Sequence, residues 1–109
     1  MKEKLYDNGN CKFYVESLAD GKVVVHCDML YLGPESYRKT REDFEVIKAL
    51  LKDEGIDELY ALSDENDVKH RKFLRLYGFV IEGETHILGK KKLVYKQSTE
   101  FGGGWWEHQ

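Results

Sequence analysis

Long apolar runs, a signal peptide and an excess of positive charge are all missing from this sequence of 109 residues. Its uncharged apolar stretches last only a few residues, which excludes a membrane-spanning helix. A net charge of −3 excludes a general attraction to nucleic acid or to anionic lipid. The first seven residues, MKEKLYD, lack the apolar core of a secretory signal, so a cytoplasmic protein is expected.

Metal-binding and redox motifs are missing as well. Cys11 and Cys27, the two cysteines, are too far apart in sequence for a Cys-x-x-Cys motif. Both fall in candidate strands, where free cysteine behaves as a small hydrophobic residue, so we expect two buried thiols. The four histidines do not have the spacing of metal ligands (His26, His70, His86 and His108), and no structural metal is expected.

The composition indicates one folded domain. Hydrophobic residues make up 41% of the chain and aromatic residues 13%, which is enough to fill a single core. The character changes after residue 96, where three consecutive glycines precede Trp105 and Trp106. We therefore expect a domain over residues 1–96 and a flexible aromatic tail over residues 97–109.

Hydrophobic periodicity and turn residues divide the domain into strands and helices. Asp20-Gly21 is a strong hairpin signal, and Gly33-Pro34 ends the strand that follows it. The first helix begins either at Pro34 or Glu35, or at a cap on Thr40, and it ends at Gly55. Its buried stripe is predicted to contain Phe44, Ile47, Leu50 and Leu51. Residues 1–10 are read as a turn-rich lead-in, and the other predicted elements are strands over 11–18, 22–32 and 56–62, a helix over 67–77, a strand starting at 79–81, a turn at 82–84 and a last strand over 86–96.

This β-β-α-β-α-β-β order predicts an α/β (α+β) fold with a mixed central sheet and two helices. The two strands that flank the first helix are expected to be parallel, because a helical connection of this length gives a right-handed crossover. The two strands of the first hairpin are expected to be antiparallel.

The segment ALSDENDVKHRKFLRLYGFVIEG, residues 61–83, resembles part of the GNAT superfamily of acetyl-CoA-dependent N-acyltransferases. Gly78-Phe79 lies where that family has a Gly-Phe pair, and Asn66 falls close to its characteristic asparagine. The resemblance covers about residues 11–96. It implies a GNAT-like fold, acetyl-CoA as the cofactor and Asn66 as a cofactor-binding residue.

The cofactor loop departs from the family pattern. Members hold the pyrophosphate of coenzyme A on a glycine-containing loop at a helix N-terminus, where bare main-chain N–H groups face the anion. The matching stretch here, residues 38–43, has no glycine. Arg38, Lys39 and Arg41 could bind phosphate through their side chains instead, and they are our candidate cofactor residues.

The catalytic residues depart from the pattern too. Where the family often has a tyrosine, four residues before the glycine of Gly-Phe, this chain has Leu74, which cannot transfer a proton. Tyr77 and Asp28 remain weak catalytic candidates. Glu16 and Glu58 are further carboxylates that could act as bases, although a strand carboxylate is usually only solvated. His26 and Cys27 are a poor pair, because adjacent strand residues point to opposite faces.

The family also has an N-terminal strand and two helices that shape its amine site. Only ten residues precede Cys11, so the N-terminal part of the fold is expected to be truncated. The three departures together favour a non-catalytic or weakly catalytic protein with no cofactor.

Residues 67–74, DVKHRKFL, are similar to a segment of small GNAT-like proteins of tailed bacteriophages. This resemblance implies a virion or assembly component, in the host cytoplasm or the particle, that contacts phage structural proteins through Trp105 and Trp106. The alternative is an acetyl-CoA-dependent N-acetyltransferase acting on a protein or small-molecule amine, whose amine site a partner chain would complete. Basic residues in 69–75 and 90–96 raise a third hypothesis, nucleic-acid binding, but a solvated face is favoured.

Overall fold

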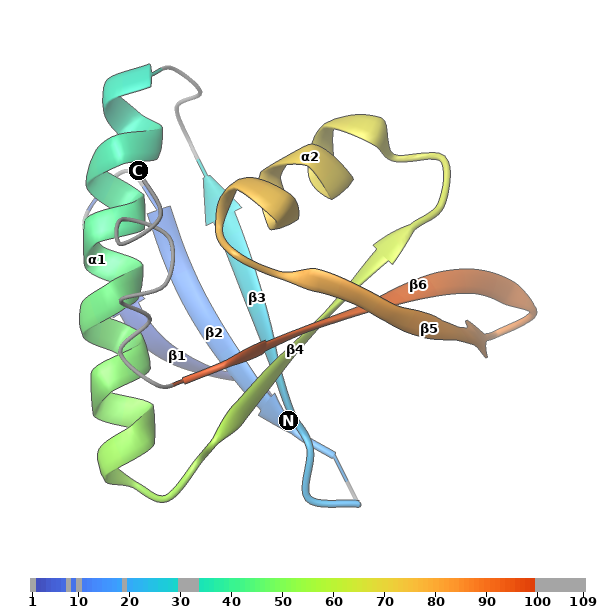
Figure 1. Cartoon of the computed structure of the whole chain (residues 1–109), viewed down its shortest axis with the longest axis horizontal. Helices are drawn as coiled ribbons and strands as arrows, with labels where there is room; N and C mark the ends of the chain where they lie inside the picture. The colour runs from blue at the N-terminus through green and yellow to red at the C-terminus, as the bar shows by residue number, and fades with distance from the viewer. Residues whose placement is uncertain (1, 8, 10, 19, 30–33, 100–109) are drawn as a thin grey trace.

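The computed structural model describes residues 2–7, 9, 11–18, 20–29 and 34–99, and it contains one six-stranded sheet and two helices in that part of the chain (Figure 1). The strand order is β1-β2-β3-β4-β6-β5, in which β3 and β4 are parallel and all other neighbours are antiparallel. The predicted mixed sheet and the parallel pair around the first helix are confirmed. The elements are β1 (Lys2–Asp7), β2 (Cys11–Ser17), β3 (Val23–Met29), α1 (Pro34–Asp53), β4 (Glu58–Asp64), α2 (Val68–Leu76), β5 (Val80–Ile87) and β6 (Lys90–Ser98).

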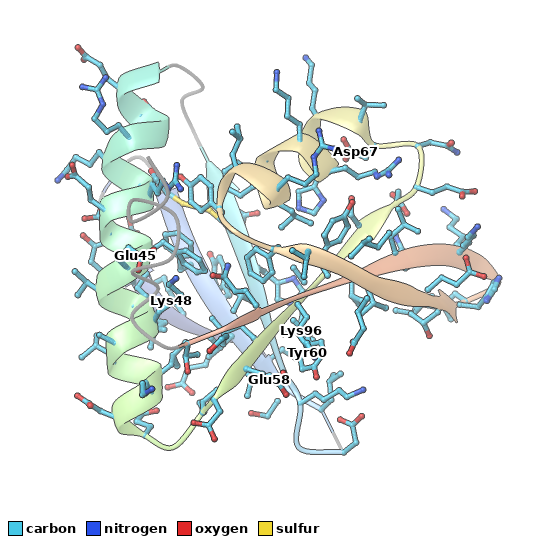
Figure 2. The ribbon with its side chains drawn as sticks, in the orientation of Figure 1. Glu45, Lys48, Glu58, Tyr60, Asp67 and Lys96 are labelled. Carbon is cyan, nitrogen blue, oxygen red and sulfur yellow. A yellow bond between two sulfur atoms is a disulfide. The ribbon has the colours of Figure 1, made fainter. Side chains whose placement is uncertain are left out.

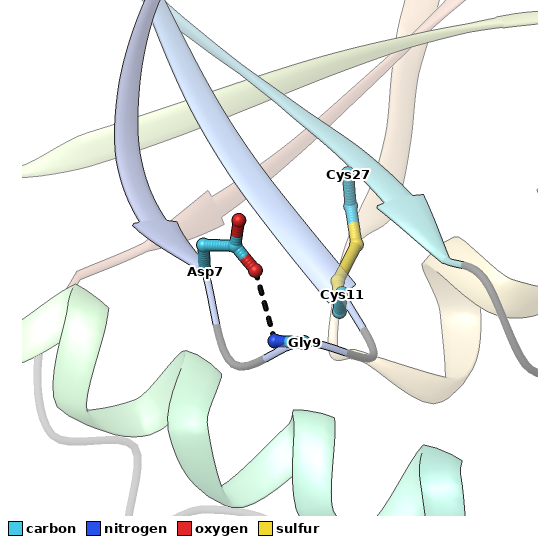
Figure 3. The surroundings of a disulfide bond; sticks show 4 residues. All are labelled: Asp7, Gly9, Cys11 and Cys27. Carbon is cyan, nitrogen blue, oxygen red and sulfur yellow. Dashed lines mark hydrogen bonds between the residues drawn. A yellow bond between two sulfur atoms is a disulfide. The ribbon is translucent and has the colours of Figure 1, made fainter.

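The reading of residues 1–10 as a lead-in is wrong, because residues 2–7 form β1 at one edge of the sheet. β1 pairs with β2, and the Asp7 carboxylate accepts a hydrogen bond from the Gly9 N–H at 2.8 Å in the connection between them (Figure 3). Tyr6 lies against Phe13, with ring centroids 6.4 Å apart. Three consecutive charged residues, Lys2 to Lys4, begin this segment, which suits an edge strand but hides its period from sequence inspection.

The two tight turns differ in how well the sequence predicts them. Gly21 has φ +86° in the turn between β2 and β3, as its Asp-Gly signal predicts. The turn predicted at residues 82–84 is wrong, since β5 continues through it with an irregularity between Ile81 and Gly83. The chain reverses instead at Leu88 and Gly89, with φ of +53° and +78°, between Ile87 and Lys90, which face each other.

Helix α1 begins at Pro34, which decides between the two predicted starts, and Gly55 follows it with φ +88°. Phe44, Ile47 and Leu51 are buried as predicted. Leu50 is 53% exposed, so its place in the buried stripe is wrong. Lys48 takes that place, because it lies one turn after Phe44 on the same face of the helix.

Helix α2 is one residue shorter at each end than predicted. The Asp67 side chain caps it by accepting a hydrogen bond from the His70 N–H, and Gly78 follows it with φ +92° (Figure 2 labels Asp67). Tyr77, at its C-cap, is buried beside Phe44 and Phe73, with ring centroids 5.7 and 4.3 Å away. The structure therefore places this weak catalytic candidate in the core.

The core lies between both helices and one face of the sheet. Every second residue on β2, β3, β4 and β6 faces it, and the aromatic rings of Phe13 and Phe44 stack with centroids 5.6 Å apart.

The domain continues past residue 96, since β6 reaches Ser98 and Thr99 is buried. Trp105 and Trp106, with the rest of residues 100–109, lie outside the described residues. Neither helix is long and apolar enough to cross a membrane, as judged over the described part of the chain.

Candidate functional site

The sheet opens between β3 and β4. Neighbouring strands elsewhere in the sheet share long ladders, for example seven residue pairs between β2 and β3, whereas β3 and β4 share one, Val24 opposite Tyr60. From that point the two strands diverge toward their carboxyl ends, as Figure 1 shows. Strands that diverge do not satisfy the main-chain N–H and C=O groups on their facing edges, so the gap favours a ligand that can.

A pocket of about 290 Å³ lies in this gap. β2 and β3 supply one wall, and Leu62 of β4 and His70 of α2 face it. The residues of the first wall are Tyr14, Val25, His26, Cys27 and Asp28. Two histidines, a carboxylate, a phenol and a sulfur therefore meet apolar side chains in one small volume, which is typical of a binding site.

His70 is held in one orientation by Ser63. Its Nδ1 lies 2.8 Å from the Ser63 hydroxyl, which in turn donates to the Asp64 carbonyl oxygen at 3.3 Å. In the tautomer that lets this hydroxyl donate its single hydrogen to Asp64, Nδ1 carries the proton and Nε2 is left as an acceptor. Burial lowers the pKa of His70 below its usual value, against the opposing effect of Asp67 and Asp64. His70 is therefore a neutral base at pH 7.

Sequence reasoning considered His70 only as one of four histidines without metal-ligand spacing and missed this role. Leu74, at the position of the family's tyrosine, lies one turn after His70 on the same face of α2. His70 faces the pocket, and Leu74 contributes to the core and to a small apolar void of about 20 Å³ beside the pocket. A search for any proton-transferring residue one turn from Leu74 would have found it.

The second histidine is paired with a predicted carboxylate. His26 Nε2 lies 3.1 Å from Glu16 Oε1 across β2 and β3, and both side chains are about one-third exposed. Asp28 lines the pocket two residues further on. Of the three candidate carboxylates, Asp28 thus lines the pocket and Glu16 contacts its lining residue His26. Glu58 lies elsewhere and forms an ion pair with Lys96 at 3.1 Å, beside the ring of Tyr60 (Figure 2).

The expectation of two buried thiols is wrong, because Cys11 and Cys27 form a disulfide between β2 and β3 (Figure 3). Cys27 faces Phe13, two residues from Cys11, so the two cysteines lie diagonally on the same face with Cα atoms 6.7 Å apart. The spacing along the chain gives no sign of this. A two-residue turn at Asp20-Gly21 gives no sign of it either, because that register would place Cys27 opposite Tyr14 and on the other face from Cys11, whereas the observed register pairs Cys27 with Phe13.

The predicted cofactor residues do not line the pocket. Arg38 and Lys39 are exposed on the first two turns of α1, and Arg41 is half-buried. Asn66 is exposed in the turn before α2, where Arg71 donates to the neighbouring Glu65 carbonyl at 3.1 Å. Both helices begin beyond the carboxyl ends of the diverging strands, so these residues lie on the side of the sheet toward which the gap opens (Figure 1).

Three of the four lysines of β6 pair with carboxylates. Lys91 pairs with Glu84 and Glu65 at 2.9 and 3.1 Å, and the hydrogen bonds that it donates to these two groups raise the pKa of Lys91. Lys92 pairs with Asp64 in the same way, and that bond lowers the pKa of Asp64. This pairing opposes the nucleic-acid hypothesis, since a phosphate would have to displace the carboxylates.

No group of three or more potential metal ligands occurs among the residues that the structure describes.

No family model matches the sequence, and no curated protein matches it. Solved structures match its fold, among them a ribosomal-protein-S5-alanine acetyltransferase from Vibrio fischeri (16% identity, TM-score 0.62, covering 84% of this chain and 55% of that one). A putative GNAT-family acetyltransferase from Bordetella pertussis matches at 12% identity and TM-score 0.63, over 86% and 63% of the two chains. YncA, a putative acetyltransferase from Salmonella typhimurium solved with its cofactor acetyl-CoA, matches at 10% identity and TM-score 0.62, over 86% and 61%.

The chain has a GNAT-like fold. It spans 55–63% of the length of these three structures, and at these identities the match shows the fold alone. The predicted GNAT-like architecture is confirmed. The predicted resemblance to bacteriophage proteins finds no support in these matches and stays a prediction.

Proposed function

We propose that this protein binds an acyl thioester of the coenzyme A type in the gap between β3 and β4 and transfers the acyl group slowly to an amine. The observation that carries the proposal is the divergence of β3 and β4 beyond Val24 and Tyr60, with a pocket of about 290 Å³ in the space between them. A GNAT-like neighbour, the Salmonella typhimurium protein, was solved with acetyl-CoA. A coenzyme A thioester would supply an activated acyl carbonyl.

The residues present fit the thioester arm of such a cofactor. An extended arm with amide groups suits the facing edges of the diverging strands, because it can hydrogen-bond with their main chain as an added strand does. Val25 and Leu62 supply apolar walls on either side of the gap. The fit is poorer at the phosphate end, where Arg38 and Lys39 are exposed and the stretch from residue 38 to 43 has no glycine.

The chain's own groups can handle the protons of amine acylation. An amine attacks a carbonyl only in its neutral form, and His70 Nε2 can accept the proton of an incoming ammonium group. Asp28 lines the pocket, and Glu16 lies 3.1 Å from the lining residue His26, so their negative charge attracts that ammonium group. With Leu74 in place of the family's tyrosine, no side chain at that position protonates the leaving thiolate, so turnover is expected to be slow.

Calorimetric titration with acetyl-CoA, followed by release of free thiol in the presence of an amine, tests this proposal. We expect binding weaker than micromolar and thiol release that His70→Gln reduces on the order of 100-fold, the contribution of one general base. His86→Gln is the matched control, since His86 is exposed on β5 outside the pocket. Absence of binding at millimolar acetyl-CoA, or equal rates in the two variants, would contradict the proposal.

A second candidate function is the predicted one, a scaffold acting through protein contacts in a phage particle or its assembly. The observation that favours it is the sheet face opposite the core, where Tyr14, Leu62 and Val94 remain half-buried although the described helices pack on the other face. A partner could cover this face. Deleting residues 102–109, which contain Trp105 and Trp106, tests the predicted docking tail, and unchanged assembly with the natural partners would exclude it.

A further inference from the structure

We propose that Cys27 is an attachment site for a small thiol bound in the gap, which opens the Cys11–Cys27 disulfide by exchange. The inference rests on the proposed function in one respect: the thiol that the gap would present is the one released when a bound thioester gives up its acyl group. Neither the fold nor the acyl transfer requires the attachment.

The two sulfurs differ in how a ligand can approach them. Cys27 lines the pocket and also the small apolar void beside it, whereas Cys11 is fully buried and lines neither. A thiol in the gap therefore meets only one of the two sulfurs. Thiol–disulfide exchange takes place at the sulfur that is attacked, so the ligand should be found on Cys27 and the free thiol on Cys11.

The order of the strands gives the correct direction of attack. Displacement at sulfur requires the incoming and leaving sulfurs to lie on opposite sides of the sulfur under attack. Cys11 is on β2, on one side of β3, whereas Leu62 of β4 and His70 of α2 line the pocket on the other side of β3. A thiol in the pocket therefore approaches Cys27 Sγ from the side opposite Cys11 (Figure 3 shows the disulfide between β2 and β3).

The step balances with groups that are present. The ligand thiol gives its proton to a base, for which His70 Nε2 faces the same pocket. The ligand sulfur then bonds to Cys27 Sγ, the Cys27–Cys11 bond breaks, and its electron pair leaves with Cys11 Sγ, which takes up a proton. The disulfide itself is the oxidant, so one ligand thiol is oxidised and one protein thiol is formed.

The attached ligand would occupy the gap, because Cys27 is one of its lining residues. Acyl transfer would then stop until the Cys11 thiol attacks Cys27 Sγ, which re-forms the Cys11–Cys27 disulfide and releases the ligand as its thiol. The chain thereby acquires a covalent form in which its own product blocks the site.

Intact mass spectrometry of the non-reduced full chain after incubation with coenzyme A tests the inference. We expect one adduct of coenzyme A mass per chain, mapped to Cys27, with Cys11 alkylated once the non-reduced chain is unfolded. The rate should saturate with coenzyme A concentration and exceed the rate with glutathione on the order of tenfold, because bound thiol is held near Cys27. An adduct on Cys11, or equal unsaturated rates for the two thiols, would overturn the inference.

Two single variants keep the test decisive if the disulfide is open in the purified protein. Cys11→Ser leaves Cys27 as a thiol, which we expect to react with coenzyme A disulfide to give the same adduct. Cys27→Ser leaves only the buried Cys11, which we expect to remain unmodified. Reaction of both variants to the same extent, or of neither, would overturn the inference.

Desulfo-coenzyme A, which lacks the thiol, separates this inference from the proposed function. If it binds the full chain by calorimetry and coenzyme A still gives no adduct, the attachment fails and the thioester site stands. If it does not bind, and yet cysteamine attaches to Cys27 with a saturating rate, the attachment stands and the proposed function fails.

Discussion

At the scale of single residues, Ser63 and His70 show how the fold makes chemistry out of ordinary side chains. Ser63 is buried on β4 and His70 lies in the first turn of α2, so the β4–α2 connection brings them together at 2.8 Å. Burial then disfavours the charged imidazole more than the two nearby aspartates favour it, which lowers the pKa of His70. The serine fixes which nitrogen can accept a proton.

The lowered pKa of His70 predicts a pH dependence of stability. In the pH window between the lowered pKa of His70 in the folded chain and about 6.5, the unfolded chain binds the proton more readily, so protonation favours unfolding. The stability that the neutral, buried His70 contributes is fully present above about pH 6.5 and is lost as the pH falls through this window. We expect His70→Gln to lose less stability than wild type between about pH 7.5 and 5.5 in urea unfolding. An equal dependence in wild type and His70→Gln would show that His70 does not titrate in this way.

Lys48 carries a second prediction at this scale. Its ammonium group is buried, 3.0 Å from Glu45 Oε1 and 3.1 Å from Gln97 Oε1 (Figure 2 labels Lys48 and Glu45). Lys48→Met keeps most of the packing but leaves these two acceptors without their donor, at a cost of about 1–3 kcal/mol in the free energy of unfolding. The control Val46→Ala, on the exposed side of α1, should change it by less than about 0.5 kcal/mol. A Lys48→Met chain as stable as wild type would mean that the buried pair contributes nothing.

At the scale of elements, residues that act locally were predictable and residues that act through tertiary contacts were not. Gly21, Gly55 and Gly78 sit at positive φ in the turns that their neighbours predict. The burial of Lys48 in place of Leu50 on α1 was not predictable, because the hydrogen-bond acceptor of Lys48, Gln97, lies 49 residues later in the sequence. β1 was missed because pairing with β2, more than its own composition, makes it a strand.

The turn between β5 and β6 illustrates an element whose sequence opposes its geometry. Leu88 is 98% exposed and has φ +53°, a conformation that costs a side chain such as leucine about 1–2 kcal/mol. Leu88→Asn should recover about 1 kcal/mol of unfolding free energy, since Asn-Gly is the preferred pair for a two-residue turn of this type. Gly89→Ala should destabilise the protein, because Gly89 has φ +78°. Urea midpoints of both variants measure this, and a destabilised Leu88→Asn chain would contradict the turn geometry.

At the scale of the whole molecule, the sequence predicts the sheet but not the site. Strand and helix order follow from periodicity, and the GNAT-like fold follows from that order and from the segment that contains Gly78-Phe79. The pocket depends on where β3 and β4 stop pairing, and no residue in either strand marks Val24 and Tyr60 as the last pair. The same is true of the disulfide, of the Ser63–His70 contact and of the His26–Glu16 pair, since each joins residues on different elements.

The end of the domain gives the last prediction, because the predicted boundary at residue 96 and the buried Thr99 differ by three residues. The Thr99 N–H donates to the Asp57 carbonyl at 2.9 Å, and its hydroxyl donates to the Ile56 carbonyl at 2.6 Å. Gln97 donates to the Tyr77 carbonyl at 2.9 Å, which ties β6 to the end of α2. These bonds fix the loops after α1 and after α2 at once.

A chain that ends at residue 96 loses all three bonds and should unfold more easily than one that ends at residue 99 by at least about 3 kcal/mol, at roughly 1 kcal/mol per bond. Thermal and urea unfolding of the two truncated chains, compared with the full chain, measure the difference. The point variant Thr99→Val is the finer control: it keeps the main-chain bond and the volume, loses only the hydroxyl, and should cost about 1–2 kcal/mol. Equal stability of the two truncated chains would show that the domain ends at residue 96, and that β6 and Thr99 beyond it add nothing to the fold.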